Sequence, residues 1–538
     1  MRFLPFLSAA IFAFQIYIPW SVPHLVTQDG SSHVYTAFVT KDLLFHRHTS
    51  PYHELYRVQK TALPNWTGTL ILVAFLGVFG PGVFGPDHAE AFLMSICLLA
   101  GYGSIAYCAG ALAGRKTVPL ILGNWLVQSW FLWAGFYNFY LGMALMMAMV
   151  GYFIRHKERF DWKRAVMVAG GLVLIFFTHL IPVVLAACAM FMIAAWPRKN
   201  WGRLGRLSAA IAPSAILVLL YASGFHESLG LHENIRAAFL SFPQKTFMYA
   251  GGWVGEQRML WPVALGLIIA AMVCMRRAEW MSARGAVAAV TLLMFALYLL
   301  IPDLGFGGSV VKMRFAWAMF LFGSLLIFAA DRLQRFQVAI SVLVAALLVA
   351  QLVVITRQVR TTSDAAGLYL AAMEQLPAGA RFVRAEYPAP VTARHFETDR
   401  LVFDPLLHLA ALGAVRRHAV DLSDYQSATG TFSVAFKPSI GEGYRGSLWS
   451  LESPEAGTLA GLDWVRKNIP VSIDYLVVFG EEPPEEATGR GTLVGAEVSE
   501  AFVRVYRLLP AAAQSPVQVH DRAEFIAAQA GQIELAGK

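Results

Sequence analysis

The sequence predicts a mostly α-helical protein, in which a polytopic membrane bundle of about 11 or 12 spans is followed by a C-terminal α/β soluble domain. Hydrophobic residues make up 57% of the 538 residues and charged residues only 14%, whereas soluble domains carry about 25% charged residues. Long apolar runs recur from the N-terminus to residue 356. After Arg357 charged and turn-forming residues become frequent, and no later run is long enough to cross a membrane.

The distribution of basic residues predicts how the bundle is oriented. The 43 basic and 35 acidic residues give a formal net charge of +8. Basic residues gather in the short loops 155–164, 198–206, 276–284 and 331–335, a pattern typical of cytoplasmic loops. This pattern explains the excess charge without nucleic acid, which we do not expect as a partner. We expect a protein of the cell inner (plasma) membrane with a cytoplasmic N-terminus and an extracytoplasmic C-terminal domain.

The first apolar run and the cysteines carry no processing or metal-binding signal. The run that follows Met1 is long and has no Ala-x-Ala site after it, which predicts an uncleaved first span. The cysteines lie inside apolar runs without a CxxC pair, which favours small buried residues over disulfides or metal ligands. They are Cys97, Cys108, Cys188 and Cys274.

The spans follow from the lengths of the apolar runs, because a helix needs about 20 apolar residues to cross the hydrocarbon core. The candidates are 4–22, 67–84, 90–112, 118–135, 137–154, 165–180, 182–196, 208–224, 260–275, 285–302, 314–330 and 337–356. If every candidate crossed, the basic loop 155–164 would lie outside, against the charge rule. One early segment is therefore expected to be short or re-entrant. The first suspect is 118–135, where Asn124 and Gln128 lie one helical turn apart.

Three outer loops connect these spans within a membrane domain that we place at residues 1–357. They are 24–66, 225–258 and 303–313. In the first loop, the apolar spacing from Ser32 to Phe45 predicts a helix in the plane of the interface. Ser31 or Ser32 is the expected N-cap of that helix.

The C-terminal domain, residues 361–510, is predicted to have a mixed α/β fold. Residues 366–375 have a helical pattern, and 380–384, 473–479 and 502–506 have the composition of strands. Residues 511–538 are expected to form a loosely held tail. The sequence contains no P-loop, no G-x-G-x-x-G and no zinc signature.

An acid and a histidine stand just beyond the first span, in Thr27-Gln28-Asp29-Gly30-Ser31-Ser32-His33. Asp29 is a candidate general base or metal ligand at the membrane surface, and the alternative is an ordinary loop or capping carboxylate. His33 is a candidate to support Asp29 by hydrogen bonding or to ligate a metal with it. The alternative for His33 is a structural helix residue.

Four further residues are candidates for binding an anion near the outer face. Lys312 and Arg314 follow a loop with three glycines in four positions, 305, 307 and 308, and a guanidinium can grip a phosphate through two hydrogen bonds. Lys245 precedes an apolar stretch of the second outer loop that is a candidate lid. His179 lies at a span end beside Pro182, where an ionisable residue is a functional candidate. The alternatives are headgroup anchoring and helix capping.

The arrangement of these pieces resembles the GT-C superfamily of integral-membrane glycosyltransferases. The resemblance implies a polyprenyl-phosphate-linked sugar as donor and a glycan, lipid or protein as acceptor, at the outer face of a membrane. Asp29 would be the acid that acts as base or helps to hold a divalent metal such as Mg²⁺ or Mn²⁺, and Arg314 or Lys312 would hold the donor phosphate. Many members have two adjacent acids in this loop, whereas here Gly30 follows Asp29.

The missing acid leaves other functions open. Asp87 or Glu90 could supply it, but the count of spans puts their turn on the cytoplasmic side, so we do not expect it. A non-enzymatic membrane scaffold or assembly factor of the same fold would not need the second acid. A transporter of a lipid-linked sugar would not need a base, although the internal repeats common in transporters are absent from the sequence.

Overall fold

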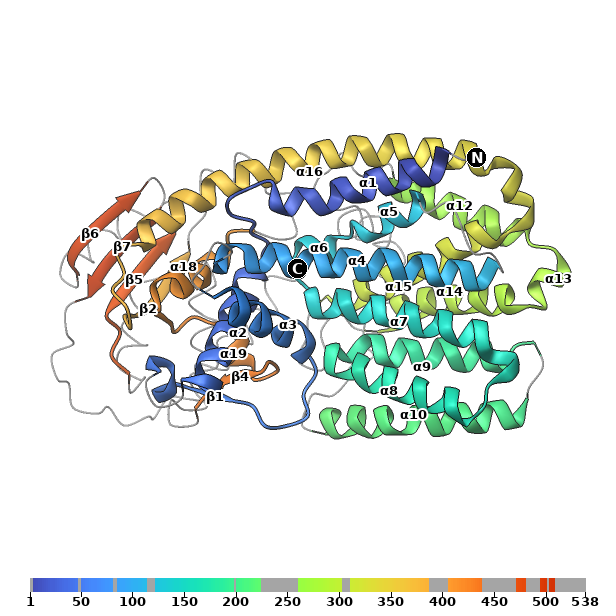
Figure 1. Cartoon of the computed structure of the whole chain (residues 1–538), viewed down its shortest axis with the longest axis horizontal. Helices are drawn as coiled ribbons and strands as arrows, with labels where there is room; N and C mark the ends of the chain where they lie inside the picture. The colour runs from blue at the N-terminus through green and yellow to red at the C-terminus, as the bar shows by residue number, and fades with distance from the viewer. Residues whose placement is uncertain are drawn as a thin grey trace.

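The computed structural model describes an elongated molecule with a helical bundle at one end and a small α/β domain at the other (Figure 1). The described residues are 3–46, 50–80, 85–113, 121–197, 200–223, 260–301, 310–386, 405–437, 471–479, 494–500 and 503–508. Lys245, the loop 303–309 and the expected tail 511–538 lie outside them.

The bundle and the segment after its first helix contain most of the helices. They are α1 (Phe3–Trp20), α2 (Gly30–Phe45), α3 (Trp66–Phe79), α4 (Pro86–Ala113), α5 (Ile121–Val127), α6 (Trp130–Trp133), α7 (Tyr137–His156), α8 (Trp162–Thr178), α9 (Leu180–Ala195), α10 (Trp201–Ala222), α12 (Leu260–Cys274), α13 (Arg277–Trp280), α14 (Ala283–Leu300), α15 (Val311–Ala329) and α16 (Gln337–Met373), with the short 3₁₀ turns η1 (Pro51–Glu54), η2 (Lys157–Arg159) and η4 (Asp331–Phe336).

The remaining elements are the strands and two short helices. They are β1 (Tyr56–Val58), β2 (Arg381–Glu386), α18 (Leu409–Arg417), β3 (Val420–Asp421), α19 (Tyr425–Thr429), β4 (Val434–Phe436), β5 (Tyr475–Phe479), β6 (Val494–Glu500) and β7 (Val503–Leu508).

The helices confirm the predicted membrane bundle. Each predicted span coincides with a helix or, for 118–135, with the two short helices α5 and α6. Among the described residues, six helices are long and apolar enough to cross a membrane. Polar side chains cap the starts of two helices of the bundle: the Asp161 carboxylate accepts the Arg164 N–H at 2.9 Å, and the Asn200 side chain accepts the Arg203 N–H at 3.0 Å.

Side-chain hydrogen bonds show that α4 runs antiparallel to α1. Near the start of α1, Ser8 bonds Tyr102 at 3.0 Å. Beyond its end, the Thr27 hydroxyl donates to Glu90 at 2.6 Å. The residue numbers fall along α4 as they rise along α1, so α4 begins at the end of the bundle where Asp29 lies. We call this the site end.

The segment 118–135 crosses the bundle, so the suspicion that it is re-entrant is wrong. Asn124 donates to the Ser8 backbone carbonyl at 3.0 Å, and the Ala134 carbonyl accepts the Asp29 N–H at 3.2 Å. These contacts advance in parallel with α1 and end at the site end. The break between α5 and α6 is buried, as broken backbone at membrane depth must be. There the Gln128 side-chain nitrogen donates a hydrogen bond to the side-chain oxygen of Gln15 at 3.0 Å.

The early segment that does not cross is α3, a helix of 14 residues. Its first turn lies at the site end, because the Gly68 N–H donates to Asn138 in the first turn of α7 at 2.8 Å. Its later part stays near the start of α4, since Phe75 stacks on Phe92 with the ring centroids 4.6 Å apart. The turn that carries Glu90 therefore lies at the site end, and the expectation that it lies on the opposite face is wrong.

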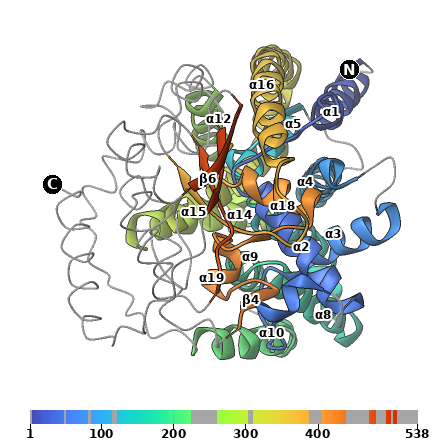
Figure 2. The same ribbon diagram turned by 90° about the vertical axis from the view of Figure 1, so that its left-hand side faces the viewer.

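Helix α2 occupies the residues predicted for the interfacial helix, but it is not a surface helix. Every residue from Gly30 to Thr40 is buried, because the C-terminal domain packs over it (Figure 2). Its N-cap is Asp29 rather than Ser31 or Ser32. The sequence pattern describes only the helix itself and not the chain that covers it.

The C-terminal domain is built on a mixed five-stranded sheet of order β3-β2-β5-β7-β6. β2 pairs in parallel with β3 and β5, whereas β7 pairs antiparallel with β5 and β6. The three predicted strands correspond to β2, β5 and β7. The predicted helix 366–375 is not separate, because α16 continues for 37 residues from the bundle to the sheet (Figure 1).

Two connections join the first outer loop to the C-terminal domain. Strand β1 pairs antiparallel with β4, with Tyr56 opposite Phe436. The Tyr56 hydroxyl also donates to the Asp421 carbonyl at 2.6 Å. The loop that carries Asp29 and the soluble domain therefore form one packed body.

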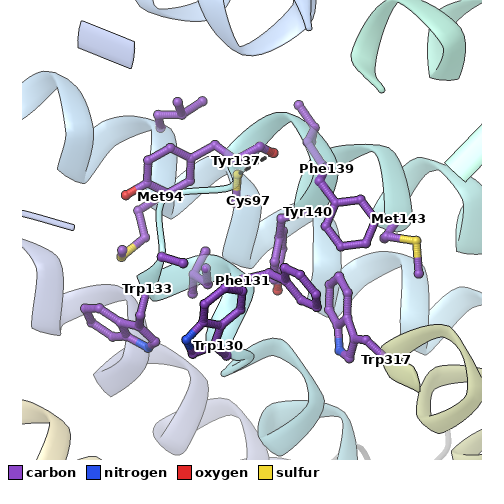
Figure 3. Packing of buried hydrophobic residues seen from close by; sticks show 14 of the residues in the cluster. Met94, Cys97, Trp130, Phe131, Trp133, Tyr137, Phe139, Tyr140, Met143 and Trp317 are labelled. Atoms are coloured by element: carbon purple, nitrogen blue, oxygen red, sulfur yellow. Dashed lines mark hydrogen bonds between the residues drawn. The ribbon is translucent and has the colours of Figure 1, made fainter. Parts of the chain in front are cut away.

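Aromatic side chains fill the space around the broken crossing at the site end (Figure 3). Trp130, Phe131 and Trp133 of α6 are all buried. Phe131 lies edge-on to Phe139 of α7, with centroids 4.7 Å apart, and packs on Trp317 of α15 at 5.5 Å. Large rings bury much apolar area with few rotatable bonds, so they hold α7 and α15 in place beside the site.

Candidate functional site

Asp29 is held between the bundle and the C-terminal domain. It follows α1, stands at the N-cap position of α2 without a capping hydrogen bond from its side chain, and is only 8% exposed. Its carboxylate accepts hydrogen bonds from the Gln28 amide at 3.3 Å and from the Tyr425 hydroxyl. The His408 Nε2 lies 3.6 Å from its Oδ1. The carboxylate is thus buried and surrounded by donors.

The environment of Asp29 suits it to proton transfer near neutral pH. Burial raises the pKa of its carboxyl group to about 7, although the hydrogen bonds from Tyr425 and Gln28 and the charge of Arg314 act in the opposite direction. A general base works best when its pKa lies near the working pH. A pKa in this range is compatible with the role of general base that the sequence suggested for Asp29.

Glu90 lies directly against Gly30, the position after Asp29. A Cβ added at Gly30 would overlap the Glu90 carboxyl group, with Oε2 at 2.5 Å. Glu90 Oε1 accepts the hydroxyls of Thr27 and Tyr137 at 2.6 and 2.7 Å, while the buried Oε2 has no hydrogen-bond partner in the described chain. A second acid thus stands where the side chain of residue 30 would project. Glu90 was not expected here, because the count of spans put its turn on the opposite face of the membrane.

A close backbone approach brings α2 and the broken crossing together. Gly135 has a φ of +78°, a left-handed conformation that favours glycine. A Cβ there would lie 2.9 Å from the Asp29 nitrogen. The His33 side chain makes a hydrogen bond to the Gly135 backbone. This turn fixes the height of Asp29 relative to α6 and α7.

His33 contacts Gln426 rather than the Asp29 carboxylate. Its Nδ1 is 3.3 Å from the Gln426 amide nitrogen, and its ring packs near Tyr137 and Phe432. No hydrogen bond between the side chains of His33 and Asp29 is present among the described contacts. Burial lowers the pKa of His33 to about 4, so it is neutral near pH 7. The imidazole beside Asp29 is instead that of His408.

Arg314 and His179 meet at the same end of the bundle. The Arg314 Nη1 lies 2.8 Å from the His179 Nε2. Its guanidinium lies 4.9 Å from the Phe139 ring centroid and 5.4 Å from that of Phe136, so it is held by cation–π contacts. The structure brings this pair close enough to Asp29 for the charge of Arg314 to act on that carboxylate.

Lys312 points elsewhere. It is 1% exposed, and its Nζ lies 5.9 Å from the ring centroid of Tyr298 on α14. Because Lys312 lies two residues before Arg314 on α15, the two side chains project from different faces of that helix. Among the described candidates, the structure therefore groups Arg314 and His179, but not Lys312, with Asp29.

The C-terminal domain contributes residues that the sequence analysis missed. His408 precedes α18, and its Nδ1 is 3.0 Å from the Arg384 Nη2. Its ring stacks on Tyr425 with centroids 4.5 Å apart. The only signal in the sequence was a histidine within the apolar run Leu406-Leu407-His408-Leu409-Ala410, which identifies no partner.

The described residues do not fit a metal site held by the protein alone. Among them, no three His, Cys, Asp or Glu side chains are placed to share an ion. Asp29 and Glu90 offer two carboxylates, but hydrogen bonds from Tyr425 and Gln28 to Asp29 and from Tyr137 to Glu90 occupy part of their acceptor capacity.

No family model matches the sequence, and no curated protein matches it. The oligosaccharyltransferase of Archaeoglobus fulgidus, in complex with Zn and sulfate, shares 11% identity over 93% of this chain and 73% of its own, with a TM-score of 0.47. ArnT from Cupriavidus metallidurans, bound to undecaprenyl phosphate, shares 12% identity over 94% and 99%, with a TM-score of 0.49.

The arabinofuranosyltransferase AftD from Mycobacteria superposes with a TM-score of 0.52 and 16% identity, over 95% of this chain and 40% of that one. The chain has the GT-C fold. The resemblance drawn from the sequence is thus confirmed at the level of fold. The chain spans about two fifths of the length of AftD. An identity as low as 16% shows a shared fold but not a shared activity.

Proposed function

We propose that the protein is a membrane glycosyltransferase that moves a sugar from a polyprenyl-phosphate donor to a glycan, lipid or protein acceptor. The observation that carries the proposal is the buried Asp29, whose pKa of about 7 suits a base, under the charge of Arg314 at one end of an apolar bundle. A lipid-linked donor needs these three parts: apolar helices for its tail, a cation for its phosphate and a base for the acceptor.

The reaction assigns one step to each side chain. Asp29 takes the proton of the acceptor hydroxyl or amide as the acceptor atom bonds to the anomeric carbon of the sugar. The bond between that carbon and the phosphate oxygen breaks, and polyprenyl phosphate leaves with the bonding electrons. Negative charge grows on the phosphate in the transition state, so a fixed cation there accelerates the reaction. Arg314 is that cation in this proposal.

The contacts of Arg314 support this role. His179 and the rings of Phe136 and Phe139 restrain the guanidinium before a donor binds. A charge that is already oriented costs little reorganisation when the phosphate departs. Glu90 is proposed as the second acid, because its Oε2, which has no hydrogen-bond partner among the described residues, lies beside Gly30.

The orientation of the bundle in the membrane is inferred from the positions of its basic residues. Arg155 and Arg159 at one end of α7 lie opposite the site end, where Tyr137 begins that helix. Basic residues favour the cytoplasm, so we place the site end and the C-terminal domain on the extracytoplasmic face of the cell inner membrane. Mg²⁺ or Mn²⁺ dependence remains a prediction. Because the described residues do not form a metal site, no step above is assigned to an ion.

The decisive experiment replaces Asp29 by asparagine in protein purified into nanodiscs. A panel of polyprenyl-phosphate sugars is offered, and transfer to an envelope extract is measured. We expect Asp29→Asn to lose about 10²- to 10⁴-fold in rate, the contribution of a general base. Asp364→Asn, a change at an exposed acid on α16, is the matched control and should retain full rate.

Full transfer by Asp29→Asn would remove Asp29 from the role of base. Absence of transfer by the unaltered protein with every donor, together with a wild-type cell envelope in an Asp29→Asn and Arg314→Ala strain, would favour a scaffold. Deleting 361–538 cannot separate these functions, because it also removes His408 and Tyr425 from the site.

A further inference from the structure

We propose that His408, supplied by the C-terminal domain, is a positioning residue that orients the Asp29 carboxylate for the acceptor through its Oδ1. The proposal deepens the function proposed above and rests on it. It also assigns the C-terminal domain a part in holding the base in position, which the sequence did not indicate.

The hydrogen-bonding of Arg384 determines which nitrogen of His408 carries the proton. A guanidinium only donates, so the contact of 3.0 Å between Arg384 Nη2 and His408 Nδ1 makes Nδ1 the acceptor. The neutral ring then carries its hydrogen on Nε2, the atom that lies 3.6 Å from Asp29 Oδ1. Such contacts are often long before substrate binds and shorten in the complex.

The ring of His408 is fixed on two further sides. Arg384 is itself anchored, because its Nη1 donates to the Leu407 carbonyl at 2.5 Å and its Nη2 to the Ser423 carbonyl at 3.3 Å. The imidazole stacks on Tyr425, with an interplanar angle of 27°. Tyr425 also donates its hydroxyl to Asp29. A second residue from the same domain thus holds the same carboxylate.

The charged and titratable groups around Asp29 leave His408 in the role of a neutral donor. Arg314 of α15, Glu90 of α4 and Tyr425 of α19 act electrostatically on Asp29 or are acted on by it. Burial, then the charges of Arg384 and His33, lower the pKa of His408 well below its usual value. His408 therefore keeps its charge state throughout the range in which Asp29 titrates.

A donor at Oδ1 favours the ionised form of Asp29. Loss of that donor should therefore raise the pKa of Asp29. Replacing His408 by phenylalanine keeps the stacking on Tyr425 and removes the donor. We expect the pKa of Asp29 to rise from about 7 by roughly one unit. The rate of His408→Phe should then be about tenfold below that of the unaltered protein at pH 6 and nearly equal to it at pH 9.

The experiment measures the pH profile of transfer for His408→Phe, His408→Gln and Arg384→Met. Glutamine keeps an N–H donor, and we expect it to restore most of the profile, whereas Arg384→Met should shift the profile in the same direction as His408→Phe. His418→Asn, a change at an exposed histidine of the same domain, is the control and should not shift it. A lower rate without any shift for His408→Phe, or no rescue by glutamine, would overturn the proposal.

A second measurement does not depend on transfer. Labelling of Asp29 by dicyclohexylcarbodiimide, which reacts with protonated buried carboxyls, is followed against pH by mass spectrometry. The midpoint of labelling should rise by about one pH unit in His408→Phe, and an unchanged midpoint would contradict the positioning role. Full transfer by Asp29→Asn would instead refute the proposed function, so the two failures are distinct.

Discussion

The contact between Gly30 and Glu90 makes a prediction that can be tested without knowing the substrate. Gly30 lies in a helix and has no left-handed φ, and the three atoms nearest to an added Cβ all belong to the Glu90 carboxyl group. Gly30→Ala should therefore destabilise the fold by about 1–3 kcal/mol, the usual cost of overpacking. Glu90→Ala should also destabilise, because the buried hydroxyls of Thr27 and Tyr137 lose their acceptor, at about 1–3 kcal/mol for a buried group left unsatisfied.

The double variant Gly30→Ala/Glu90→Ala separates this contact from other effects. The new methyl group would occupy space that the carboxyl leaves, so the two losses should not add, and we expect a coupling of about 1–3 kcal/mol. The chain has two domains, so apparent thermal midpoints in detergent are compared rather than fitted free energies.

The control is Gly103→Ala on α4, where an added Cβ would meet no other part of the described chain within 4 Å. Its midpoint should stay the same or rise. The reasoning would be refuted if the double variant lost as much as the sum of the two single variants, because the clash would then not lie between these residues.

Three further outcomes are expected. The transfer rate should be half-maximal near pH 7 and fall about tenfold per unit below it, because burial raises the pKa of Asp29 to about 7 and only the ionised carboxylate accepts a proton; a flat profile between pH 5 and pH 8 would contradict this. Arg314→Ala should lower kcat by about 10²- to 10³-fold, with Arg314→Lys retaining part of it; steady-state kinetics would show an unchanged kcat if the assignment were wrong. Arg416→Ala should break the 2.8 Å ion pair with Asp87 and cost at most about 1 kcal/mol, since the pair is partly exposed; a lost kcat with an unchanged thermal midpoint would argue against this structural role.

Much of the fold was accessible from the sequence. The helices of the bundle follow its apolar runs, because a backbone in lipid must satisfy its own hydrogen bonds and only long apolar helices do so locally. The strands β2, β5 and β7 were predicted from their composition. The prediction that α3 crosses the membrane was wrong. This helix is as apolar as a span but has only 14 residues, and its packing against α2 and α4 keeps it at the site end.

The sequence by itself determined that the chain builds a helical bundle with an α/β domain and that Asp29 follows its first span. Only the tertiary structure decided that Glu90 lies beside Gly30 and that His408 faces Asp29. The physical reason is that periodicity and composition report how a segment meets its surroundings, but not which distant segment provides them. Side chains far apart in the chain meet through the packing of α4 and of the C-terminal domain around α2, and no local pattern records that packing.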